Sequence, residues 1–135
     1  MNINEFKQKV HKELPNSNLT VSTENELKKL KSIFGGLPDE YLFFLKTIGY
    51  GSFNNCAFSI YGGPLEPDEI FDPETASELT HYIFIGDDSS GWMLAYDTSQ
   101  TPYELTFFDH NEKSELAEHE KSSLVNFLNF ELFER

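Results

Sequence analysis

The spacing of apolar residues changes near residue 50, so the chain must combine helices with a separate block of strands. Before this point, apolar residues recur at helical spacing: Ile3, Phe6, Val10 and Leu14. They predict a helix over about 3–14, which Pro15 ends. After it, short runs such as 57–61 alternate, as strands do. Helices followed by strands predict an α+β domain.

Two further helices are predicted before residue 50. Thr23 can cap one of them, because Glu26 lies three residues later and completes a capping box. Gly35 and Gly36 then end this helix. Another begins at 37–39, since proline suits a first helical turn, and it ends at Gly49. Phe43 falls outside its apolar stripe, so we expect this helix to be covered on more than one side.

An antiparallel meander is predicted for the middle of the chain, because its strands are joined by short turns. We expect strands over 57–61, 82–85, 92–96 and 103–108. Gly62-Gly63-Pro64 should end the first strand, and residues 64–80 should form a loop with one helical turn. A final helix is expected over about 120–133. With 135 residues and no linker, the chain is predicted to be one domain, 1–135.

The charge of the chain is strongly acidic and unevenly distributed. The formal net charge is −13, yet residues 1–46 hold seven lysines and six acids. From residue 47 to residue 112 there is no lysine or arginine, while twelve carboxylates occur there. Such a field repels nucleic acids and anionic lipids and attracts basic partners. The acidity serves either solubility or a surface that faces a partner.

The compartment is predicted from what the sequence lacks. Cys56 is the single cysteine and cannot form an internal disulfide. The first residues have no apolar core of a signal peptide, and no run reaches the roughly 18 apolar residues of a membrane span. We therefore expect a cytoplasmic protein without membrane contact, with leaderless export as the alternative.

Catalytic and metal motifs are not found, so we predict no enzyme, no metal and no cofactor. The segment 86–91 matches neither a calcium loop nor a nucleophile elbow, and a hairpin turn is favoured. The histidines have no zinc-site spacing: His11, His81, His110 and His119. Cys56 is far from any cation in sequence and is interpreted as buried or half-buried. The catalytic alternative is a metal-dependent hydrolase that uses Asp87, Asp88 and Asp109.

Seven carboxylates are the candidate partner-binding residues. Five crowd the proline-containing loop after residue 65, and two lie in the predicted hairpin turn: Glu66, Asp68, Glu69, Asp72, Glu74, Asp87 and Asp88. The loop has little apolar cover, so the acidic groups are either a solvated surface or a partner-binding loop. Both interpretations remain open from the sequence.

Four motifs follow one another along the chain. LPDEYLFFL lies at 37–45, GYG at 49–51, IGDDSSGW at 85–92 and AYD at 95–97. The first two are similar to the LPxxYxxFL…GG signature, and the last two to the later strand pair, of the SUKH superfamily, which includes Smi/Knr-type cell-wall regulators and bacterial immunity proteins. The resemblance covers about 22–133. Tyr50 and the extra helix at about 3–14 depart from the family pattern.

The resemblance implies a curved antiparallel sheet with flanking helices, and in bacteria an immunity protein that blocks a cognate polymorphic toxin, often a nuclease. Its signature residues would be structural: Leu37, Pro38, Tyr41, Gly49, Gly86 and Gly91. The acidic strand block is the expected binding face, since nucleases carry basic clefts. The alternative is a regulatory or scaffold interaction module, for example in cell-wall assembly. We expect a monomer or weak dimer that binds no nucleic acid.

Overall fold

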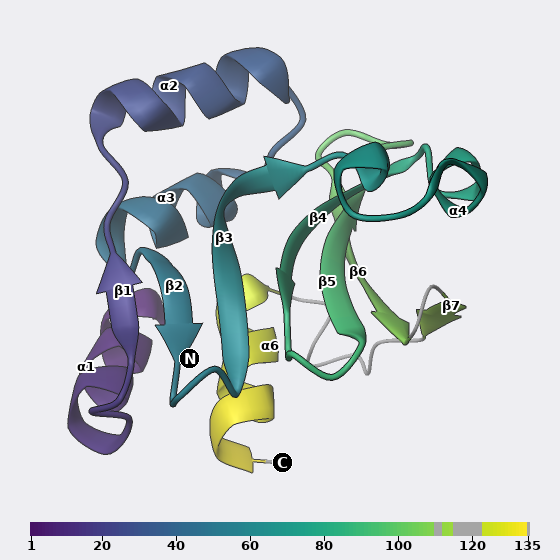
Figure 1. Ribbon diagram of the computed structural model, residues 1–135. Coiled ribbons are helices and arrows are strands. Elements are labelled where there is room, and N and C mark those ends of the chain that lie inside the picture. Colours follow the sequence, from purple (N-terminus) through teal and green to yellow (C-terminus); the bar gives the residue numbers. More distant parts are fainter. Residues whose placement is uncertain (110–111, 115–122, 135) are drawn as a thin grey trace.

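The computed structural model describes residues 1–109, 112–114 and 123–134, and for 112–114 the backbone alone. It is an α+β fold in which one curved antiparallel sheet is flanked by N-terminal helices and a C-terminal helix (Figure 1). Its strands are β1 (Asn18–Thr20), β2 (Tyr50–Phe53), β3 (Phe58–Leu65), β4 (Tyr82–Asp87), β5 (Trp92–Asp97), β6 (Glu104–Asp109) and β7 (Glu112–Ser114). They follow one another across the sheet in chain order, so the predicted meander and fold class are confirmed.

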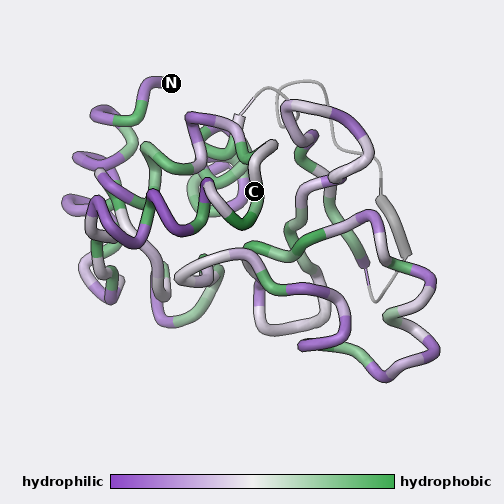
Figure 2. The backbone as a smooth tube through the Cα atoms, turned by 90° about the horizontal axis from the view of Figure 1, so that it is seen from above, coloured by the Kyte–Doolittle hydropathy of each residue, from purple (hydrophilic) through white to green (hydrophobic). Residues whose placement is uncertain are grey.

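The helices lie before, within and after the strand block. They are α1 (Ile3–Glu13), α2 (Glu24–Ile33), α3 (Asp39–Thr47), the 3-10 turn η1 (Pro67–Glu69), α4 (Pro73–Glu78), α6 (Leu124–Asn129) and the π-helical turn η2 (Phe130–Glu134). Figure 2 shows hydrophobic and hydrophilic stretches alternating along the chain near the N-terminus, as expected for helices with one buried side. Among the described residues, no helix is both long enough and apolar enough to cross a membrane.

The three N-terminal helices begin close to the residues predicted from the sequence. The Asn2 side chain accepts a hydrogen bond from the backbone of Glu5 at 2.9 Å and caps α1. Thr23 and Glu26 form the predicted capping box of α2. The prediction for Phe43 is wrong, because this side chain is 50% exposed. It lines a surface hollow between α2 and α3, so α3 is not enclosed on that side.

Several strand boundaries differ from the prediction. β1 and β2 were not expected, and residues 50–53 continue from the turn at Gly49 directly into the sheet. β3 does not end at Gly62-Gly63-Pro64 but runs on to Leu65. The pairing of β3 with β4 shifts register between Ile60 and Leu65, and a proline is tolerated at such an irregularity because it breaks no regular ladder bond. The predicted loop 64–80 holds two helical segments, η1 and α4.

The final helix is described from Leu124 onward. Ser123 has extended backbone angles and accepts a hydrogen bond from the backbone of Asn126 at 2.9 Å, so α6 begins at Leu124. The expected start near residue 120 lies outside the described residues. A π-helical turn follows α6 and carries the chain to Glu134.

Both faces of the sheet are covered. One face packs against α1, α3 and α6, and its core holds fully buried rings such as Phe6, Phe44 and Phe127. The other face carries a smaller cluster of Leu79, Phe84, Ala95 and Phe108. The chain from η1 to α4 covers this second cluster, and it carries most of the candidate partner-binding residues.

Candidate functional site

The acidic segment, which we define as residues 66–78, is fixed to the sheet by apolar contacts. The ring of Phe71 meets that of Phe84 edge-on, with centroids 5.3 Å apart and an interplanar angle of 69°. Ala76 is buried on the inner side of α4, and Leu79 continues the contact just beyond it. Edge-to-face rings and buried aliphatic groups hold a segment in one position. The acidic groups are therefore displayed on a supported surface and not on a free loop.

Three carboxylates of the acidic segment stabilise its own short helices. Glu66 and Glu69 form a capping box around η1, in which the backbone of Glu66 donates to Glu69 at 2.7 Å. Asp72 caps α4 by accepting from the backbone of Thr75 at 2.7 Å. Hydrogen bonds from Thr75 hold the pKa of Asp72 below its ordinary value. All three carboxylates therefore have hydrogen-bond donors within the segment.

The remaining two candidate carboxylates of the segment are exposed to solvent. Asp68 and Glu74 are exposed, and no hydrogen bond found among the described residues engages their carboxylates. A hollow of about 410 Å³ separates η1 from α4 beside them. Its lining residues are Glu66, Pro67, Asp68, Pro73, Ala76, Ser77 and Thr80. The segment thus offers a recess lined by the acidic residues Glu66 and Asp68, and Glu74 is exposed next to its lining residue Pro73.

The hairpin pair, Asp87 and Asp88, is held by hydrogen bonds within and near its turn. Asp87 accepts from the Tyr61 hydroxyl at 2.6 Å and from the backbone of Ser89 at 2.8 Å. Asp88 accepts from the backbone of Ser90 at 2.9 Å and of Trp92 at 3.1 Å. Burial, and then the bond to Asp87, raises the pKa of Tyr61. The hairpin interpretation of 86–91 is confirmed, although the strand continues through Asp87.

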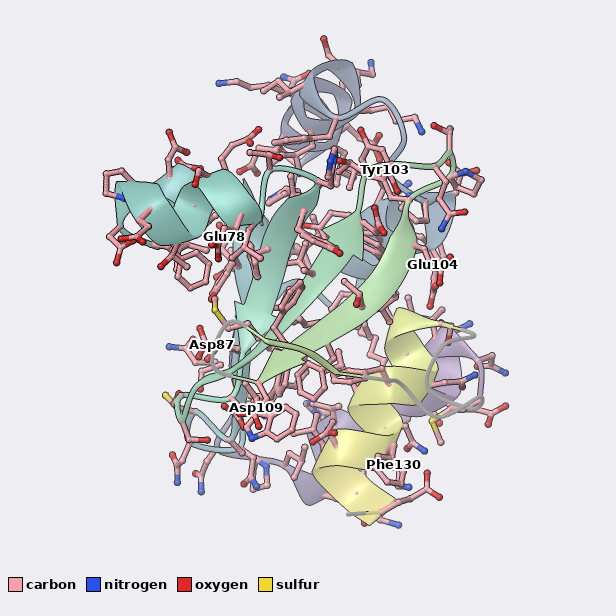
Figure 3. The ribbon with its side chains drawn as sticks, turned by 90° about the vertical axis from the view of Figure 1, so that its right-hand side faces the viewer. Glu78, Asp87, Tyr103, Glu104, Asp109 and Phe130 are labelled. Atoms are coloured by element: carbon pink, nitrogen blue, oxygen red, sulfur yellow. The ribbon has the colours of Figure 1, made fainter. Side chains whose placement is uncertain are left out.

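The structure separates the seven candidate carboxylates into two groups. Asp87 pairs with Ser59 at the start of β3, whereas Glu66 follows the end of the same strand. Figure 3 shows Glu78 of the acidic segment near one end of the sheet and Asp87 near the other. Asp109, from β6, lies at the same end as Asp87. The single acidic face expected from the sequence is therefore two surfaces, joined by strands β3 and β4.

The three carboxylates of the metal-dependent hydrolase alternative do not form a cluster of metal ligands in the described part of the chain. The carboxylate oxygens of Asp87 and Asp88 accept hydrogen bonds from backbone N–H groups and, for Asp87, from the Tyr61 hydroxyl. Among the residues that the structure describes, no three histidine, cysteine, aspartate or glutamate side chains converge as metal ligands would. His110 and His119 lie outside the described residues. His11 and His81 are both exposed, on α1 and just before β4 respectively.

Cys56 corrects another prediction, because its side chain is exposed. It closes the β2–β3 turn, in which Asn54, Asn55 and Cys56 all have positive φ angles, of 51°, 54° and 67°. Its backbone donates to the Ser52 hydroxyl at 2.8 Å, and that hydroxyl donates to the Cys56 sulfur at 3.3 Å. The left-handed turn carries the side chain away from the core, which apolar character alone would not indicate.

The signature residues are placed within the core and at sharp turns. Leu37 and Tyr41 are 1% and 0% exposed, and Pro38 occupies the N-cap of α3. Gly49 and Gly91 have φ angles of 102° and 109°, which other residues rarely adopt. A Cβ atom at Gly86 would lie 2.5 Å from the backbone oxygen of Ser59.

Sequence reasoning missed a polar joint between α3, β5 and α6. The Glu40 carboxylate accepts from the backbone of Val125 at 3.2 Å, near the start of α6. Burial raises the pKa of Glu40, although hydrogen bonds from Val125, Ser123 and Leu124 act in the opposite direction. Burial first, and then Glu40, raises the pKa of Tyr96 well above its ordinary value. From the sequence, Glu40 is recognisable only as an acidic residue in the first turn of a helix. Its contact with the start of α6 has no signal among the neighbouring residues.

No family model, no curated protein and no solved structure matches this chain. The resemblance to the SUKH superfamily therefore rests on the motifs in the sequence, and its functional implications remain predictions.

Proposed function

We propose that this chain is an immunity protein that binds and neutralises a cognate toxin, and that the acidic segment is its contact surface. The toxin is expected to be a nuclease with a basic cleft, and the chain acts in the cytoplasm by binding, without catalysis of its own. The proposal combines the SUKH-like motifs with the chemistry of the acidic segment.

The observation that carries the proposal is a supported set of carboxylates in a stretch without cations. The acidic segment is packed on the sheet through Phe71 and Ala76, so its binding costs little ordering entropy. The segment lies within the stretch 47–112, which has no lysine or arginine. Its carboxylates therefore have no lysine or arginine close in sequence. Such a surface speeds association with a basic protein.

The arrangement of Asp68 and Glu74 favours the same class of partner. Asp68 lines the recess between η1 and α4, and Glu74 is exposed in the first turn of α4. An arginine or lysine of a nuclease cleft that normally meets a phosphate can enter this recess and pair with Asp68, and a second cation can pair with Glu74. In the hairpin pair, by contrast, carboxylate oxygens already accept local hydrogen bonds. We therefore assign the contact to the acidic segment and a supporting structural role to the hairpin pair.

The experiment measures binding to the product of the gene next to this one, and survival of cells that express both. Asp68→Lys with Glu74→Lys should lower the affinity at least tenfold and abolish protection. Glu5→Lys with Glu13→Lys changes the net charge equally on α1 and should leave both unchanged, because these residues lie outside the acidic segment.

Three outcomes contradict the proposal. Equal weakening by both charge-reversed variants means that only net charge matters. Unchanged affinity in the Asp68 and Glu74 variant means that the partner binds elsewhere. Tight binding to a neighbouring product that has no toxic activity supports instead the regulatory or scaffold alternative.

A further inference from the structure

A second surface lies at the β1 edge of the sheet, opposite the β7 edge. Its charge is opposite to that of the acidic segment. It is a groove of about 1290 Å³ between α1 and β1. Figure 1 shows β1 at the outer edge of the sheet, next to α1. Apolar side chains contribute to its lining: Val10, Leu14, Leu19 and Ile48. An apolar lining at a sheet edge is suited to an extended chain.

The ionisable side chains that line this groove are basic. Lys7, His11 and Lys12 come from α1, beside the uncharged Asn4 and Gln8, and among the described residues no aspartate or glutamate lines the groove. Lys7 and His11 are four residues apart and therefore stand one above the other on the helix. The acids of α1, Glu5 and Glu13, are about 200° away from Lys7 and His11 respectively, because each residue turns the helix by about 100°. In a chain of net charge −13, this is a local reversal of sign.

The edge strand β1 turns one backbone donor and one acceptor away from the sheet. A Cβ atom at Gly51 would lie 2.1 Å from the backbone oxygen of Asn18, and one at Gly49 would lie 2.4 Å from that of Thr20. The carbonyl groups of Asn18 and Thr20 therefore point toward β2. Since backbone groups alternate in direction along a strand, the N–H and C=O of Leu19 point to the open edge. The sheet order begins at β1, so no described strand occupies that side.

We propose that the groove between α1 and β1 binds an extended acidic peptide from another protein, which adds a strand beside Leu19. The outward backbone groups of Leu19 supply the pairing, the apolar lining receives alternate side chains, and Lys7 and Lys12 pair with carboxylates. The acidic segment of a second copy of this chain is not a suitable occupant, because η1 and α4 make it helical and not extended. The proposal does not depend on the toxin-binding function.

The test uses a fluorescent peptide of about ten residues with alternating glutamate and valine, the usual length range of a strand. It should bind the full chain at low salt, and a lysine–valine peptide of the same length should not. The same acidic peptide with N-methyl groups along one edge should lose binding, because it cannot donate backbone hydrogen bonds there. Equal binding of the N-methylated peptides, whichever edge is modified, would overturn strand addition.

Matched variants locate the site. Lys7→Glu with Lys12→Glu should weaken binding of the acidic peptide at least tenfold. Lys28→Glu with Lys29→Glu changes the net charge equally on exposed positions of α2 and should leave binding within twofold. Equal weakening by both variants, or no binding of the acidic peptide at low salt, would refute the proposal. Analytical sedimentation can refute it as well. A dimer that dissociates only when Lys7 and Lys12 are replaced would mean that a second copy of the chain occupies the groove.

Discussion

Tyr41 occupies the centre of the contact between α3 and the sheet. Its ring meets Tyr96 edge-on at 5.6 Å, and the whole side chain is buried. Its hydroxyl has no hydrogen-bond partner among the described residues. Burial accordingly raises the pKa of the Tyr41 hydroxyl. An unpaired buried hydroxyl opposes folding, while the ring that carries it supports folding.

Removal of this hydroxyl is expected to leave the protein equally stable or more stable. Tyr41→Phe keeps the ring and removes the unpaired group, so the free energy of unfolding should stay equal or rise by about 1 kcal/mol. Tyr41→Ala should lower it by about 3–5 kcal/mol, because it also leaves a cavity. Urea unfolding measures both. A loss above about 1 kcal/mol for Tyr41→Phe would show that the hydroxyl has a partner in the folded protein.

Glu40 should make stability depend on pH in a direction unusual for an acid. Its pKa in the folded protein is raised above 4.5, so the folded state binds the proton more tightly than the unfolded state. Its contribution is therefore most favourable below about pH 4.5 and is lost as pH rises through the raised value.

Glu40→Gln tests this sign, because the amide oxygen can still accept from Val125 but cannot ionise. The stability gained by Glu40→Gln relative to the wild type should be larger at pH 7 than at pH 4, as measured by urea unfolding at both. A gain for Glu40→Gln that is larger at pH 4 would mean that the charged carboxylate stabilises the start of α6.

At the scale of elements, local signals predicted the helices better than the strands. The apolar spacing over 3–14, the Thr23 capping box and Pro38 are signals within a few residues, so α1, α2 and α3 could be placed from sequence. β1 has only three residues, and its pairing with β2 joins segments about 30 residues apart. A strand this short has no alternation of its own, and its partner determines it.

The acidic site was likewise predictable in its members but not in its geometry. The sequence identifies the carboxylates of 66–74 and the pair at 87–88. Their separation depends on how β3 and β4 pair, from Ser59 with Asp87 to Leu65 with Phe84. Pro64 and two glycines indicate a turn, yet the neighbouring strand keeps this segment extended. Tertiary pairing of that kind overrides local preference.

A substitution at Gly86 tests whether strands β3 and β4 approach each other as closely as the structure shows. Gly86→Ala places a methyl group 2.5 Å from the backbone oxygen of Ser59, and also close to the Ile60 and Phe58 side chains. We expect a loss of about 1–3 kcal/mol in the free energy of unfolding, the usual cost of overpacking. Gly35→Ala, where nothing lies within 4 Å, should cost little. Equal effects at the two positions in thermal unfolding would contradict the close approach.

The whole molecule carries two charged surfaces of opposite sign on one sheet. Seven of the nine lysines belong to α1, α2 and α3, and the stretch from β2 to β6 has none. The acidic segment covers one sheet face, while the basic groove lies at the β1 edge. A charge asymmetry of this kind orients a partner as it approaches. Composition alone could not show this, because a net charge of −13 conceals the local basic groove.

Hydrogen exchange of the chain bound to the product of the neighbouring gene tests the central claim most directly. The account predicts that backbone amides of residues 66–78 become protected in the complex. The effect should disappear with Asp68→Lys and Glu74→Lys, while Glu5→Lys with Glu13→Lys retains it. Protection confined to β1 and α1, or no complex with that product, would contradict the claim that the acidic segment binds a toxin.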